Sequence, residues 1–101
     1  MPANVRNRVL LRTPYLSIYL VHYRAGHRVL PHVDGVARGR LYKLNCVLVK
    51  PARGGEFHCE RTIFNLWDRL VLFRPDLHEH AVSRIEAGSR WLLSFAVLRG
   101  G

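Results

Sequence analysis

His32 and Asp34 are the first residues whose types and spacing suggest chemistry, because both side chains bind metal ions in proteins. They close a segment, residues 28–34, whose composition favours a β-strand. Side chains two positions apart on a strand point to the same face. A neutral imidazole and a carboxylate on one face can supply two of the three protein ligands of a 2-His-1-carboxylate iron site. Such a site needs a second histidine further along the chain.

The composition predicts one globular domain, because the chain has 101 residues of which 49% are hydrophobic. No apolar run approaches the roughly 20 residues of a membrane-spanning helix. The first residues lack the apolar segment of a signal peptide, so a cytoplasmic protein is expected. Cys46 and Cys59 lack Cys-x-x-Cys spacing and are predicted to be buried thiols rather than a disulfide or a zinc site.

The formal net charge is +9, and 14 of the 16 basic residues are arginine. An excess of this size favours anionic partners such as nucleic acid, an acidic peptide or a small polycarboxylate. The arginines are spread along the whole chain, which is equally typical of a well-solvated surface. Nucleic-acid binding is therefore an alternative and not the main expectation.

Short segments rich in β-branched and aromatic residues predict about eight strands after residue 15 and no long helix. Residues 1–7 are expected to be frayed. The predicted strands cover residues 16–23, 28–34, 41–49, 56–59, 62–67, 70–73, 80–85 and 90–98. Strands at this spacing predict an all-β sandwich or barrel.

The C-terminal third resembles the end of the prolyl-hydroxylase-like Fe(II)/2-oxoglutarate dioxygenases. In that family a histidine is followed by apolar residues two and five positions later, and then by a glycine and an arginine. The residues that fit these places are His80, Val82, Ile85, Gly88 and Arg90. The stretch from Tyr23 to Asp34 and the turn at residues 54–56 resemble the first half and the middle of family members. The similarity extends over residues 16–98.

The resemblance implies a single minimal domain, residues 1–101, with a double-stranded β-helix (jelly-roll) at about residues 16–98 and few or no helices. It implies Fe(II) held by His32, Asp34 and His80, with 2-oxoglutarate and O2 as co-substrates and ascorbate as a reductant. The implied reaction hydroxylates a C–H bond of a protein or peptide residue or of a small molecule, and it releases succinate and CO2. The primary substrate is not evident from the sequence.

The resemblance also assigns the co-substrate contacts. Arg90 would pair with the far carboxylate of 2-oxoglutarate, because a guanidinium can donate two parallel hydrogen bonds to a carboxylate. Many relatives have a serine at the place of Leu92, so Ser94, on the same strand face as Arg90, is the candidate second donor. Tyr23 matches a family position that contacts the co-substrate. Val47 stands where family members often have a tyrosine.

Several alternatives stay open. His78 competes with His80 for the metal, since a Pro-x-x-His loop resembles the related cupin superfamily, although the spacing to Arg90 favours His80. The alternative functions are a non-catalytic cupin-like metal-binding jelly-roll and an oxygenase that acts on nucleic acid. Three other histidines are expected at the surface or next to the metal ligands: His22, His27 and His58. Trp67 and Trp91 are expected to pack in the fold, and Glu56 is expected to belong to a turn.

An association is expected over the larger sheet, because relatives cover it with helices that this chain lacks. Trp91, Leu93 and Phe95 lie opposite the Arg90 face, and leaving each in water would forgo about 1.5–3 kcal/mol. The strand at residues 16–23 also offers an edge for pairing. A homodimer or a partner chain is therefore predicted, with residues 1–15 folding back across the sheet as the alternative. Substrate contacts are expected from residues 9–15 and 35–39.

Overall fold

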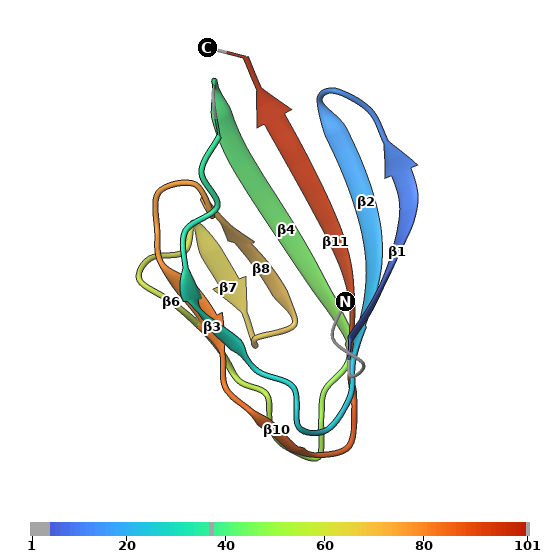
Figure 1. The fold of residues 1–101 in the computed structure, drawn as a ribbon. Helices are drawn as coiled ribbons and strands as arrows, with labels where there is room; N and C mark the ends of the chain where they lie inside the picture. Colours follow the sequence, from blue (N-terminus) through green and yellow to red (C-terminus); the bar gives the residue numbers. More distant parts are fainter. Residues whose placement is uncertain (1–4, 37, 101) are drawn as a thin grey trace.

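The computed structural model describes residues 5–36 and 38–100, and the regular structure in this part of the chain consists of β-strands alone (Figure 1). The strands are β1 (Val5–Arg12), β2 (Leu16–Tyr23), β3 (Val29–His32), β4 (Arg40–Val49), β5 (Arg53–Gly54), β6 (Phe57–Cys59), β7 (Phe64–Leu66), β8 (Leu70–Phe73), β9 (His80–Val82), β10 (Ile85–Ala87) and β11 (Arg90–Arg99). No helix within the described residues is long and apolar enough to span a membrane.

The strands form a jelly-roll of two facing layers. One layer is a six-stranded sheet in the order β1-β2-β11-β4-β8-β7, and the other is a three-stranded sheet in the order β3-β9-β6 (Figure 1). A short β10-β5 ladder closes one end. The layers meet where Phe57 of β6 contacts Phe73 of β8, with ring centroids 5.0 Å apart. The predicted all-β double-stranded β-helix is confirmed.

The first strand corrects two expectations. Residues 5–7, predicted to be frayed, belong to β1, which pairs antiparallel with β2. Because β2 lies between β1 and β11, the prediction that residues 16–23 form a free edge is wrong. Residues 5–12 also extend the sheet sideways and do not fold back across its face. The backbone groups of β2 that would otherwise attract another chain are bonded to β1.

The predicted strand at residues 80–85 is interrupted after Val82, so that β9 and β10 pair with different partners. Ser83 and Arg84 make the break, and the Ser83 hydroxyl accepts a hydrogen bond from the Glu56 N–H (2.9 Å). Gly54 allows the two segments to approach closely at this break, because it has φ +74° and a Cβ there would lie 2.1 Å from the Arg84 carbonyl oxygen. Glu56 thus takes part in this connection through its backbone, and the prediction of a turn role for its side chain stays a prediction.

Trp67 contradicts its predicted packing role, since 83% of the residue is exposed. It sits with Asp68 in the tight turn between β7 and β8, and both residues have positive φ, 54° and 53°. The turn is closed by the Arg69 N–H donating to the Leu66 carbonyl (2.9 Å). A turn of this mirror-image type matches the strand twist and directs its central side chains outward.

The two cysteines are free but only partly buried, which corrects the prediction of buried thiols. Cys46 lies on β4 and Cys59 ends β6. The Cys59 thiol donates to the Arg61 carbonyl at 3.2 Å. Neither cysteine belongs to a cluster of metal-binding side chains within the described residues.

β11 divides its faces as predicted. Its inner face carries Arg90, Leu92 and Ser94, all at most 4% exposed. The outer face carries the partly exposed Trp91, Leu93 and Phe95. The expected packing role of Trp91 agrees with its ring lying flat on the ring of His22 of β2, with centroids 4.0 Å apart.

Association over this outer face remains a prediction. Light scattering coupled to size-exclusion chromatography is expected to give twice the chain mass of 11.7 kDa at micromolar concentration. Replacing Phe95 with arginine is expected to return the protein to the monomer mass, because the charge cannot be buried against a second apolar face. A wild-type protein that elutes as a folded monomer would contradict the homodimer.

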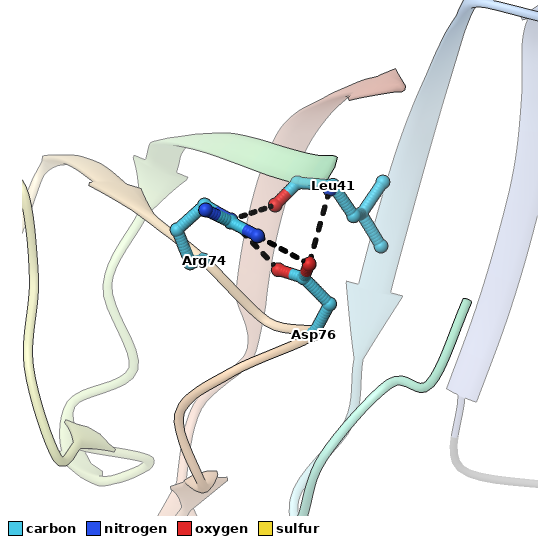
Figure 2. Close-up of polar contacts among 3 residues, drawn as sticks. All are labelled: Leu41, Arg74 and Asp76. Atoms are coloured by element: carbon cyan, nitrogen blue, oxygen red, sulfur yellow. Dashed lines mark hydrogen bonds and ion pairs between the residues drawn. The ribbon is translucent and has the colours of Figure 1, made fainter. Parts of the chain in front are cut away.

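A partly buried ion pair fastens the loop after β8 to the start of β4 (Figure 2). The Arg74 guanidinium donates to both Asp76 oxygens, at 2.9 and 2.6 Å, and to the Leu41 carbonyl at 3.1 Å. The Leu41 N–H donates in turn to Asp76 at 3.3 Å. The hydrogen bonds from Arg74 hold the pKa of Asp76 below its ordinary value. The site described below depends on this loop.

Replacing Asp76 with asparagine is expected to lower the free energy of unfolding by about 1–2 kcal/mol, because the partly buried Arg74 loses a charged hydrogen-bond partner. Since the folded pKa of Asp76 is depressed, its contribution is present above the unfolded value of about 3.9 and is lost as the pH falls through the folded pKa. Urea titrations of wild type and variant should therefore converge below about pH 4. The exposed Glu86 is the control: Glu86→Gln should change little at any pH.

Candidate functional site

Three side chains from two distant segments of the chain converge between the two layers. His32 ends β3, Asp34 follows it, and His80 begins β9, directly across the ladder from His32. Asp34 lies 3.2 Å from His32 Nε2 through one oxygen and 3.5 Å from His80 Nε2 through the other. Their donor atoms all lie within 4.8 Å of one another, and this is the single such group of three within the described residues.

Backbone carbonyls set the orientation of both imidazoles. His32 Nδ1 lies 2.8 Å from the Leu30 carbonyl, and His80 Nδ1 lies 3.0 Å from the His78 carbonyl. A carbonyl oxygen only accepts, so each Nδ1 carries the proton and each Nε2 presents its lone pair toward Asp34. This is the arrangement by which proteins orient histidines that bind metal ions. His78 contributes through its backbone, and its imidazole is outside the cluster.

Asp34 reaches the cluster from a loop, which corrects the predicted strand at residues 28–34. β3 ends at His32. The Asp34 N–H then donates to the Pro75 carbonyl (2.7 Å), in the loop that the Arg74–Asp76 pair holds. The carboxylate is therefore placed by a contact between two loops and not by a shared strand face.

Apolar neighbours surround His80, which is 7% exposed. The edge of its ring faces Phe73, with centroids 5.2 Å apart. Burial lowers the pKa of His80, although the hydrogen bond with the His78 carbonyl and the charge of Asp34 oppose this shift. The imidazole therefore stays neutral, as a metal ligand must, to a lower pH than an exposed histidine would.

Arg90 is the second charged feature of the interior, and it is 4% exposed. Its guanidinium carbon lies 5.8 Å from the centre of the Tyr23 ring, its cross-strand neighbour on β2. Burial lowers the pKa of Arg90 and raises that of Tyr23. Within the described residues no carboxylate lies within ion-pair distance of Arg90, so its charge is buried without a counter-charge.

Ser94 and Asn45 add two unsatisfied polar groups. They face each other across the β11–β4 ladder, and both are buried, at 1% and 7% exposure. Within the described residues, the Ser94 hydroxyl and the Asn45 side-chain oxygen have no hydrogen-bond partner. Buried polar groups are rarely left unpaired, so both atoms are suited to bind a polar ligand.

A cavity of about 610 Å³ joins these groups. Its walls include the three clustered side chains, Tyr23, Arg90 and Ser94, so every residue predicted for the metal or the co-substrate lines one space. Lys43 and Asn45 line it as well, and the sequence reasoning missed both. The alternation of Lys43, Asn45 and Val47 along β4 was the available signal, because side chains two apart share a face.

The other predicted positions are divided. Of the expected contact segments, residues 12–15 and Val36 line the cavity, whereas residues 9–11, 35, 38 and 39 do not; residue 37 lies outside the described residues, and contact with a substrate stays a prediction. His22 and His27 stack on Trp91 and Tyr23, away from the cluster. His58 is largely exposed and lies 4.0 Å from Glu56.

Comparisons with solved structures agree on the fold. The cupin domain of Schizosaccharomyces pombe Cnp3 superposes with a TM-score of 0.69 at 15% identity, over 97% of this chain and 67% of that one. KdgF from Halomonas sp. gives 0.63 at 18% identity, over 97% and 83%. The structure of Rhodobacter sphaeroides SigE in complex with the anti-sigma ChrR gives 0.56 at 21% identity, over 96% and 46%.

Sequence comparison identifies the family. A search of curated proteins finds no significant match. The family model described as the 2OG-Fe(II) oxygenase superfamily matches residues 18–97, most of the chain and all of the cluster. The chain therefore belongs to the 2OG-Fe(II) oxygenase superfamily.

Proposed function

We propose that this protein is a 2-oxoglutarate-dependent dioxygenase of the prolyl-hydroxylase-like group, a single minimal domain that hydroxylates a C–H bond. The observation that carries the proposal is the convergence of two imidazole nitrogens and a carboxylate within 4.8 Å, in one cavity with a buried arginine that lacks a counter-charge. Family membership implies Fe(II) and 2-oxoglutarate. The cluster of three ligands suits the metal ion, and the buried arginine suits the carboxylate of the co-substrate.

The residues present fit an iron ion. His32 and His80 would bind through Nε2 and Asp34 through a carboxylate oxygen, a donor set typical of non-haem Fe(II) oxygenases. Two carbonyl groups already hold both imidazoles in the required tautomer. Bound Fe(II) would supply the activation of O2, coupled to decarboxylation of 2-oxoglutarate to succinate and CO2.

The residues also fit a dicarboxylate. Arg90 would bind the far carboxylate with two parallel hydrogen bonds, and that pairing would neutralise its buried charge. Ser94, four residues along the same face, would donate its free hydroxyl, and the Tyr23 ring would keep the guanidinium in place. Leu92 and Phe73 would exclude water from the space between Arg90 and the clustered ligands, because both are almost fully buried.

Binding and turnover test the proposal separately. Under anaerobic conditions, calorimetry should show that 2-oxoglutarate binds only when Fe(II) is present. In air, with Fe(II) and ascorbate, the protein should convert 2-oxoglutarate slowly to succinate without a primary substrate. The absence of both signals would refute the enzyme.

A non-catalytic metal-binding jelly-roll is the second candidate. Leu92 at the place where many relatives have a serine, and the cupin fold of the structural neighbours, favour it. Fe(II) binding without any Fe(II)-dependent binding of 2-oxoglutarate would support this alternative over the oxygenase.

A further inference from the structure

Lys43 is a charged residue of the cavity for which neither the metal nor the co-substrate accounts. It is one of only two lysines in the chain. It lies on β4, where it pairs with Phe73 of β8 on one side and with Ala96 of β11 on the other. Phe73 contacts the ring of His80, so Lys43 lies at the level of the clustered ligands.

Lys43 has no partner of its own. Within the described residues, no acceptor lies within hydrogen-bond distance of its ammonium and no carboxylate within 4.0 Å. Burial lowers its pKa, and Asp34 and Tyr19 only oppose this shift from a longer range. A largely buried ammonium without a bonded partner is costly, unless an anion binds beside it.

A row of paired residues crosses the large sheet at this level. Lys43 pairs with Ala96, Ala96 with Ser17 of β2, and Ser17 with Arg12 of β1. Ala96 has only a methyl group, so it leaves room between Lys43 and Ser17. Tyr19 lies beside this row, and the nearby Ser17 hydroxyl and Arg12 guanidinium lower its pKa despite partial burial. We call Arg12, Ser17, Tyr19 and Lys43 the anion subsite; all four line the cavity.

The anion subsite adjoins the place proposed for 2-oxoglutarate at Ser94, which is two residues from Ala96, and it extends away from Arg90. Ala96 follows Arg90 by six residues on β11, which is about 20 Å along an extended strand. A dicarboxylate that reaches from the clustered ligands to Arg90 therefore extends away from Ala96 and Arg12. Lys43 lies beside the ligands, and Ser17 and Arg12 continue the subsite across β2 and β1, where Tyr15 also lines the cavity.

The charge of the cavity leads to the same conclusion. Three cationic side chains line it, Arg12, Lys43 and Arg90, against the single carboxylate of Asp34. A divalent ion would add two positive charges, and dianionic 2-oxoglutarate would offset no more than that. A net positive charge would remain on the side of Lys43, which favours a further anion there.

We propose that the anion subsite binds a carboxylate of the primary substrate, and that this substrate is a small organic acid. The inference rests on the proposed oxygenase function and specifies its substrate class. Lys43 would supply the counter-charge, Ser17 and Tyr19 would donate hydroxyl hydrogen bonds, and Arg12 would close the outer side. The bound acid would then place a C–H bond beside the clustered ligands. A nucleic-acid backbone does not fit a space bounded by one short row of side chains.

Matched acids and amides test the subsite under anaerobic conditions, with Fe(II) and saturating 2-oxoglutarate. The probes are propionate and propionamide, benzoate and benzamide, and glutamate and glutamine, measured by calorimetry. We expect the acid of at least one pair to bind about 10-fold more tightly than its amide. Lys43→Met should remove this preference and leave the affinity for 2-oxoglutarate within about 2-fold. Lys50→Met is the control, because Lys50 bonds to the Trp67 carbonyl away from the cavity.

Arg12→Met is a second variant on another strand, and it should weaken acid binding without altering amide binding. Equal affinities of acid and amide in every pair would overturn the subsite. A loss of 2-oxoglutarate affinity in Lys43→Met equal to the loss of acid affinity would overturn it too, because Lys43 would then belong to the co-substrate site. If the wild type binds no 2-oxoglutarate, the proposed function fails. The affinities of the acids and amides, measured with Fe(II) alone, would then still decide whether the subsite exists.

Discussion

Replacing His80 with alanine is expected to lower the affinity for Fe(II) by more than about 100-fold. Loss of a group that merely orients a ligand typically reduces affinity 10- to 100-fold, and loss of a ligand should exceed that. His80 is buried, and its Nε2 is directed at Asp34. A water molecule in the place of the missing imidazole would have to form new hydrogen bonds in this buried space. Calorimetry with Fe(II) under anaerobic conditions measures the change, and circular dichroism checks the fold.

His78→Ala is the matched control, because His78 supports His80 through its backbone carbonyl, which the variant retains. Its affinity for Fe(II) should stay within about 3-fold of wild type. If His78→Ala loses as much affinity as His80→Ala, then His78 is a ligand and the assignment of the cluster is wrong.

Replacing Arg90 with methionine is expected to have two opposite effects. The affinity for 2-oxoglutarate should fall by about 2–5 kcal/mol, roughly 30-fold to several thousand-fold, because a buried carboxylate would lose its charge partner. Without 2-oxoglutarate, the free energy of unfolding should stay equal or rise, because the variant no longer buries a charge without a counter-charge. Calorimetry and urea unfolding measure the two effects on the same samples.

Arg53→Met is the control for Arg90→Met. Arg53 is exposed and pairs with Glu86 at 3.4 Å, an arrangement that contributes little to stability. Both measurements should stay close to wild type. If Arg90→Met strongly destabilises the protein and leaves 2-oxoglutarate binding intact, Arg90 has a structural role instead.

The family resemblance carried by His32, Asp34, His80 and Arg90 predicted one shared site, and the structure places all four around one cavity, although their roles there stay a prediction. Predictions from local sequence patterns failed at a contact between two distant loops and in one tight turn. Asp34 was predicted on a strand, but it lies in a loop, where its N–H donates a hydrogen bond to the Pro75 carbonyl. Trp67 was predicted in the core because it is apolar, but the positive φ of its turn directs it outward.

By itself the sequence determined that the fold is all-β and which face of the last strand is buried, because alternation along a strand is a local property. It also determined the family through the spacing of a few side chains. Only the tertiary structure decided that β1 covers the edge of β2, that the strand after His80 breaks opposite Gly54, and that Lys43 shares a cavity with Arg90. These features depend on pairing between residues far apart in the chain. Local alternation specifies which face of a strand is buried, but it does not specify which distant strand lies beside it.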